Sequence, residues 1–183
     1  MKRIFIALLA IGLCFPPNRA AAETDFPDYL GTDDTRLLKS GEATFRFLKL
    51  FKAFDAALYL QEGYSADQFP GDFRFSLNLR YHRPFTRDQL INSADEILND
   101  LYPDEVLLGL DDKIEAINQV YQDVSKGDQY TLFYDPDLGT QLLLNDEPQT
   151  TIEGFDFAQT YFAIWLGDHP ATKRLSKALL DQS

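Results

Sequence analysis

Residues that build disulfides and metal sites are scarce in this sequence, which has one cysteine and two histidines among 183 residues. The cysteine, Cys14, lies in an N-terminal apolar stretch that we expect to be removed, so the remaining chain has no thiol for a disulfide or a metal. The histidines, His82 and His169, are far apart and lack partners at metal-ligand spacing. No apolar run approaches the roughly 20 residues of a membrane-spanning helix. These absences predict no metal, no cofactor and no integral membrane span.

Positive charge is also in short supply, because 29 acidic residues face 17 basic ones and the formal net charge is −12. A surface of this sign repels the phosphates of nucleic acids, so we expect no nucleic-acid partner. The sequence also lacks a glycine-rich phosphate loop, a nucleophile-elbow serine and a calcium loop. We therefore assign no catalytic residue from motifs.

The N-terminus has the three parts of a secretory signal peptide. Lys2 and Arg3 supply positive charge, residues 4–15 are apolar, and small residues precede a cleavage point after Ala22. Cys14 offers an alternative, a lipid-anchored N-terminus, but the bulky Leu13 before it argues against this. We predict a signal peptide over 1–22, a flexible polar lead over 23–36, and one domain over 37–183.

The rest of the chain alternates between strand and helix patterns. Residues 73–82 alternate apolar and polar side chains, which is typical of a strand with one buried face. Thr86 and Gln89 have the spacing of a capping box, so a helix is expected to begin there. Residues 155–166 form an apolar helix pattern, and Ser40-Gly41 resembles a turn. Strands, helices, strands and helices in this order predict an α+β domain with an antiparallel sheet backed by helices.

One arginine lies in an otherwise apolar segment, because Arg46 is flanked by Phe45 and Phe47. An unpaired charge on a buried strand face is costly, so Arg46 needs a partner. One candidate is Asp55, which also lies in an apolar run. The other is the carboxylate or phenolate of a ligand, which a guanidinium group binds with two hydrogen bonds. Residue spacing leaves both open.

The segment 46–60, Arg-Phe-Leu-Lys-Leu-Phe-Lys-Ala-Phe-Asp-Ala-Ala-Leu-Tyr-Leu, resembles the signature strand of bacterial chalcone-isomerase-like proteins. Further matching features follow in the same order: Lys126-Gly127-Asp128, Leu143-Leu144-Asn145, Gly154, and Ile164-Trp165-Leu166-Gly167-Asp168 with Pro170. The resemblance implies an open-faced β-sandwich of chalcone-isomerase type, with a large antiparallel sheet, helices packed on one face and a cleft between the layers. It also implies a periplasmic location and an Arg46 that points into the cleft.

Family members include true isomerases and non-catalytic fatty-acid-binding proteins. The residues that the resemblance assigns to ring closure are absent, because Leu90 replaces the catalytic tyrosine, Phe54 the strand threonine and Glu42 the arginine. We therefore expect an exported, non-catalytic protein that binds a small hydrophobic or anionic amphipathic ligand, with Arg46, Tyr59 and Tyr81 as binding residues. The alternatives are an isomerase or lyase acting on an unsaturated or phenolic compound, and a structural or partner-binding protein with a filled cleft. The oligomeric state does not follow from the sequence.

Overall fold

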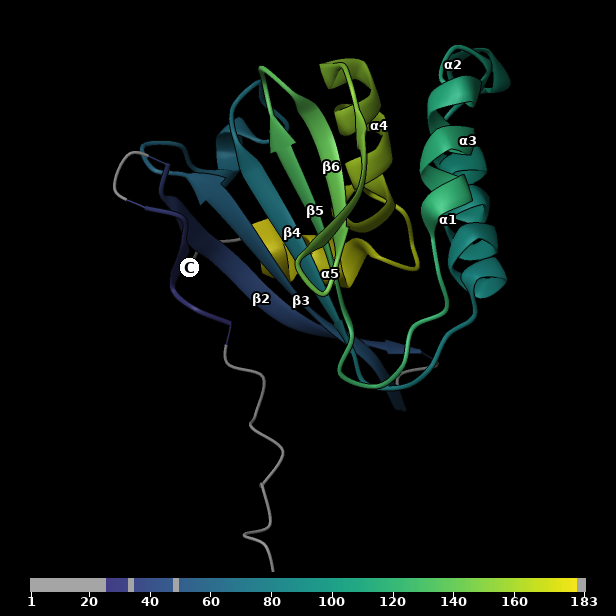
Figure 1. Ribbon diagram of the computed structural model, residues 1–183, viewed down its shortest axis with the longest axis horizontal. Helices are drawn as coiled ribbons and strands as arrows, with labels where there is room; N and C mark the ends of the chain where they lie inside the picture. Colours follow the sequence, from purple (N-terminus) through teal and green to yellow (C-terminus); the bar gives the residue numbers. More distant parts are fainter. Residues whose placement is uncertain (1–25, 33–34, 48–49, 181–183) are drawn as a thin grey trace, which may run out of the picture.

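A seven-stranded antiparallel sheet forms the body of the protein, and its strands follow one another in chain order from β1 to β7. The computed structural model describes residues 26–32, 35–47 and 50–180. The predicted signal peptide lies outside this part of the chain. In Figure 1, α4 and α5 lie behind the sheet, and α1, α2 and α3 stand beside α4. This α+β arrangement, with helices on one face of a large antiparallel sheet, confirms the expected fold class.

The strands are β1 (Tyr29–Leu30), β2 (Leu37–Phe47), β3 (Phe51–Gln61), β4 (Phe75–Tyr81), β5 (Gln129–Asp135), β6 (Gly139–Leu144) and β7 (Glu147–Ile152). The helices are α1 (Arg87–Leu101), α2 (Asp104–Leu108), α3 (Asp111–Val120), α4 (Phe155–Leu166) and α5 (Lys173–Leu180). Among the described residues, no helix is both long and apolar enough to cross a membrane.

The main core fills the space between the sheet and the helices. Its centre is Phe75 on β4, whose ring lies 4.8 Å from that of Phe162 on α4 and 5.0 Å from that of Tyr134 on β5. The alternation predicted for residues 73–82 explains this position, because Phe75, Leu77, Leu79 and Tyr81 all point to the helix side. Helix α4 is buried on several sides between the sheet and α1, which accounts for its almost wholly apolar sequence.

Helix α5 approaches the backbone of β2 closely at Gly41. A Cβ atom at this position would lie 2.5 Å from the carbonyl oxygen of Ala178, which is too close for any side chain. The hydroxyl group of Ser40 donates a hydrogen bond to the carbonyl oxygen of Leu179 at 3.1 Å. Ser40-Gly41 is therefore a helix-docking position inside β2 with a local register shift, and the turn expected there is wrong.

A smaller core lies on the other face of the sheet, which we call the outer face. Phe26 is 2% exposed and packs with Leu37, Ala57 and Tyr59. The guanidinium group of Arg80 lies 4.9 Å above the Phe26 ring. Residues 26–30 of the expected flexible lead are thus packed against the sheet, because Phe26 supplies an apolar anchor that the polar composition of 23–36 concealed.

Substitution of Phe26 tests this packing. Phe26→Ala removes a buried ring, and we expect it to lower the free energy of unfolding by about 3 kcal/mol. Urea denaturation followed by circular dichroism measures the change. Phe51→Ala is the matched control, because Phe51 is 54% exposed and its removal should change stability by less than about 0.5 kcal/mol. Equal effects of the two substitutions would show that residues 26–30 do not stabilise the sheet.

Candidate functional site

Four aromatic rings on the helix side of the sheet form a continuous series, which we call the aromatic row: Phe45, Phe54, Tyr81 and Phe85. Phe45 stacks on Phe54 at 5.0 Å, and the Phe54 and Phe85 rings contact Tyr81 edge-on at 5.8 and 5.6 Å. The three phenylalanines are only partly buried, whereas Tyr81 is 5% exposed. The row therefore leads from the surface into the main core.

Basic side chains lie next to both ends of the row. Arg46 follows Phe45 directly and pairs with Lys52 across the β2–β3 hairpin. The guanidinium group of Arg83 lies 5.4 Å above the ring of Phe85. All three cations are exposed, and within the described residues none of them forms an ion pair. An anionic group beside the aromatic row would thus meet cations that have no competing carboxylate.

The buried member of the row, Tyr81, also belongs to a group of buried tyrosines, the tyrosine cluster: Tyr81, Tyr121, Tyr130 and Tyr161. The hydroxyl group of Tyr161 donates to that of Tyr121 at 3.2 Å, and Tyr130 accepts a hydrogen bond from the backbone N–H of Gln122 at 2.8 Å. Among the described residues, the hydroxyl group of Tyr81 has no hydrogen-bond partner. Tyr81 is therefore the member of the cluster whose hydroxyl group makes no hydrogen bond within the described residues, so it can donate one to a ligand.

Burial changes the ionisation of this cluster. It raises the pKa of Tyr81 and of Tyr121 well above the ordinary value of a phenol, and it also raises the pKa of Tyr130 and of Tyr161. Neighbouring phenols add to the effect, since a phenolate at Tyr121 would lie beside Tyr161 and Tyr130. The cluster is neutral at physiological pH, so it can donate hydrogen bonds but cannot supply a phenolate base.

The three predicted binding residues lie in different parts of the fold. Tyr81 lies in the main core and Arg46 is exposed at the end of β2. Tyr59 lies on the outer face, where its hydroxyl group donates to the carbonyl oxygen of Pro27 at 2.9 Å. Arg46 lies next to Phe45 at one end of the aromatic row, and Tyr81 is the member of the row that contacts Phe54. Tyr59 lies on the opposite face of the sheet from the row.

The partners of Asp55 that the structure shows are not the expected one. Its carboxylate accepts a hydrogen bond from the hydroxyl group of Thr44 at 2.6 Å and lies 2.8 Å from Nε2 of His82. His82 comes directly after β4, which ends beside the start of β3, and this brings its ring to Asp55. Arg46 thus remains available at the surface.

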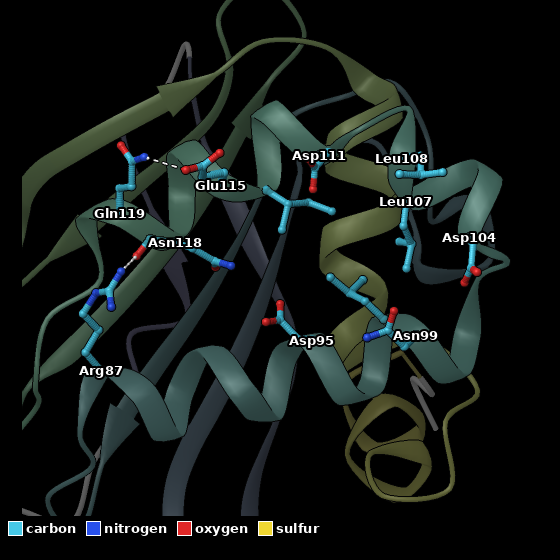
Figure 2. Close-up of a pocket in the computed structure, with 12 residues that line it drawn as sticks. Arg87, Asp95, Asn99, Asp104, Leu107, Leu108, Asp111, Glu115, Asn118 and Gln119 are labelled. Carbon is cyan, nitrogen blue, oxygen red and sulfur yellow. Dashed lines mark hydrogen bonds between the residues drawn. The ribbon is translucent and has the colours of Figure 1, made fainter.

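A separate cleft of about 610 Å³ lies between α1 and the pair α2–α3 (Figure 2). Its lining includes Leu98, Leu107 and Ile114 together with four carboxylates, those of Asp95, Asp104, Asp111 and Glu115. The one basic residue in the lining, Arg87, donates to the carbonyl oxygen of Asn118 at 2.9 Å. The negative charge of this cleft disfavours an anionic ligand, which leaves the aromatic row as the better candidate.

The fold places the protein in a class in which a large antiparallel sheet carries helices on one face. The chain is similar in structure to a fatty-acid binding protein of Arabidopsis thaliana, AtFAP1. The TM-score is 0.62 at 11% sequence identity, over 85% of this chain and 90% of the plant protein. At this identity the similarity establishes a shared fold.

The family follows from the sequence itself. The model of the chalcone isomerase-like family matches residues 18–181, so the chain belongs to this family. The resemblance drawn from residues 46–60 and the motifs after them is thereby confirmed. No curated protein sequence matches the chain.

The tyrosine cluster predicts a stability that falls at alkaline pH. Because the folded-state pKa values are raised, the unfolded chain loses its tyrosine protons first, and the stabilisation is complete below about pH 10 and is lost as pH rises further. Urea denaturation between neutral pH and pH 11 should show a decrease of about 1.4 kcal/mol per pH unit for each tyrosine that stays protonated.

The double variant Tyr121→Phe/Tyr161→Phe is the control for this prediction. It removes the hydroxyl donor and its acceptor together, so the fold should be nearly as stable as the parent at neutral pH. Its stability should fall less steeply above pH 10. An unchanged slope would contradict the role of the cluster.

Proposed function

We propose that this chain is an exported, non-catalytic binding protein that holds a small hydrophobic, fatty-acid-like molecule with an anionic head group. The aromatic row would contact the apolar part and Arg46 would bind the head. The observation that carries the proposal is the row itself, whose three phenylalanines are partly exposed and whose Tyr81 contacts the buried tyrosine cluster. The signal-peptide pattern supports a periplasmic location.

The apolar part of the ligand would replace water on aromatic surfaces. Phe45, Phe54 and Phe85 are only partly covered by the protein's own side chains, so a hydrocarbon chain laid along them gains apolar contact. Because Tyr81 contacts both Phe54 and Phe85, a chain that follows the row reaches the hydroxyl group of Tyr81.

The head group would bind where the cations lie. A carboxylate beside Phe45 is next to Arg46 and Lys52, and a guanidinium group can hold it with two parallel hydrogen bonds. Asp55 does not compete for Arg46, because Thr44 and His82 bond to it. The cleft between α1 and α3 is lined by carboxylates, so it would repel an anionic head group.

The same geometry argues against ring-closing catalysis. Such a reaction needs a fixed cation for a developing enolate and hydroxyl groups that position the reacting oxygen. Leu90, at the position that the resemblance gives to the catalytic tyrosine, is an apolar residue packed against the core, and Phe54 belongs to the aromatic row. The Tyr121 and Tyr161 hydroxyl groups are hydrogen-bonded to each other.

Removal of the head-group anchor tests the proposal. Arg46→Gln should weaken the binding of dodecanoate about tenfold, because a charge-assisted hydrogen bond contributes about 1.5 kcal/mol. The binding of methyl dodecanoate should change little, because the ester has no charge for Arg46 to bind. Isothermal titration calorimetry of both ligands measures the difference.

Lys173→Gln is the matched control, because Lys173, at the start of α5, is an exposed cation outside the aromatic row that pairs with Asp168 of the preceding loop. It should leave both affinities unchanged. Equal losses in the two variants would indicate nonspecific attraction to positive charge. Turnover of a phenolic or unsaturated compound that Arg46→Gln abolishes would support the isomerase alternative instead.

A further inference from the structure

The described tip of the β2–β3 hairpin exposes two large apolar side chains next to basic ones. Leu50 is 74% exposed and Phe51 is 54% exposed, although both belong to a charged, acidic protein. Lys52 follows them directly and pairs with Arg46 on the neighbouring strand. Figure 1 shows the hairpin reaching toward the loops that precede α1 and follow α3.

The loops at this end of the sheet add further positive charge. Arg83 lies in the loop after β4, and the exposed Lys126 lies in the turn whose Gly127 donates to the carbonyl oxygen of Tyr81. Within the described part of the chain, neither forms an ion pair. Four basic side chains thus lie at this end of a protein whose formal net charge is −12.

Two acidic groups at this end are already bonded, whereas Asp146 and Glu147 are exposed in and after the β6–β7 turn, near the opposite edge of the sheet from the β2–β3 hairpin. Asp55 is buried and interacts with Thr44 and His82. Asp128 accepts hydrogen bonds from the backbone N–H of Ser125 and from Nδ2 of Asn145. The carboxylates of Asp55 and Asp128 are therefore hydrogen-bonded within the protein. The four basic side chains at this end are instead exposed to solvent: Arg46, Lys52, Arg83 and Lys126.

We propose that this tip, formed by Leu50, Phe51 and Lys52 with Arg46 beside them, docks on an anionic lipid bilayer. Apolar side chains that project from a turn can enter the boundary between head groups and acyl chains, and adjacent cations can bind the lipid phosphates. The proposal uses only the exposure and charge of this hairpin and does not depend on the ligand at the aromatic row.

A protein partner fits the tip less well than a bilayer does. A stable protein interface buries about 800 Å² on each partner, and two side chains at a hairpin tip offer much less. A second copy of the chain would bring Arg46 and Lys52 against the same cations of its neighbour. A bilayer accepts a small apolar insertion and supplies the opposite charge.

Docking in this way would place the aromatic row beside the lipid. Phe45 precedes Arg46, and Phe54 lies two residues after Lys52, so the partly exposed rings are next to the docking residues. This consequence, transfer of a ligand between bilayer and protein, rests on the proposed function.

Vesicle flotation tests the docking of the protein that begins at Glu23, the expected product of signal-peptide cleavage. We expect binding to phosphatidylglycerol-containing vesicles, little binding to pure phosphatidylcholine vesicles, and weaker binding at higher salt. Lys52→Gln should reduce the partition coefficient about fivefold, and Leu50→Ser/Phe51→Ser by about tenfold or more.

Leu138→Ser is the matched control, because Leu138 is 52% exposed in the β5–β6 turn at the opposite end of the sheet, beside Asp137. It should leave vesicle binding unchanged. Failure to bind anionic vesicles, or equal losses in Leu138→Ser and the tip variants, would overturn the proposal. So would a dimer in sedimentation velocity that Leu50→Ser/Phe51→Ser dissociates.

The titration with dodecanoate, in the absence of vesicles, separates this proposal from the proposed function. The variant Leu50→Ser/Phe51→Ser, whose two residues lie outside the proposed ligand site, should bind dodecanoate as the parent does if its urea midpoint is unchanged, while it loses vesicle binding. Vesicle binding that survives in Leu50→Ser/Phe51→Ser would contradict docking and leave ligand binding at the aromatic row standing.

Discussion

The structure depends on the burial of one sheet face beneath α4. The described residues include no cysteine, so noncovalent contacts, chiefly apolar packing, hold the helices to the sheet. Phe75 is the centre of this packing, because its ring contacts Phe69, Phe73, Tyr134 and Phe162. Helix α5 extends the cover over β2 at Gly41, and beyond it the cover is incomplete. The aromatic row begins there, with Phe45 and Phe54 partly exposed. The candidate site is therefore a consequence of where the helices stop.

Much of the fold could be predicted from local patterns. The capping box at Thr86 and Gln89 marks the start of α1, and the apolar pattern of residues 155–166 gives α4 with both its ends. These features depend on residues that are close together in the sequence, so a single sequence is enough to predict them. Ser40-Gly41 was misinterpreted because the glycine is required by the close approach of α5, a segment more than 130 residues away. The anchor at Phe26 was missed for the same reason.

The candidate site could be predicted only in part, because it depends on strand register. The register shift between Phe45 and Arg46 interrupts the alternation of side chains along β2, so the face on which Arg46 lies does not follow from its neighbours in the sequence. Asp55 was one of the two partners considered for Arg46, but it interacts with His82, which follows β4, and no spacing rule connects Asp55 with His82. Tyr59 packs with Phe26 on the outer face. Phe26 lies outside residues 46–60, so this contact could not be predicted from that segment. The aromatic row combines three strands and a loop, so it emerges only once they are folded together.

The central claim is that the interface between sheet and helices admits a ligand along the aromatic row. A crystal structure with dodecanoate brominated at its terminal carbon tests it most directly, because the anomalous signal of bromine locates the chain end. Our account predicts bromine beside Tyr81, with the carboxylate near Arg46. Bromine in the acidic cleft between α1 and α3, or on the outer face near Phe26, would contradict it.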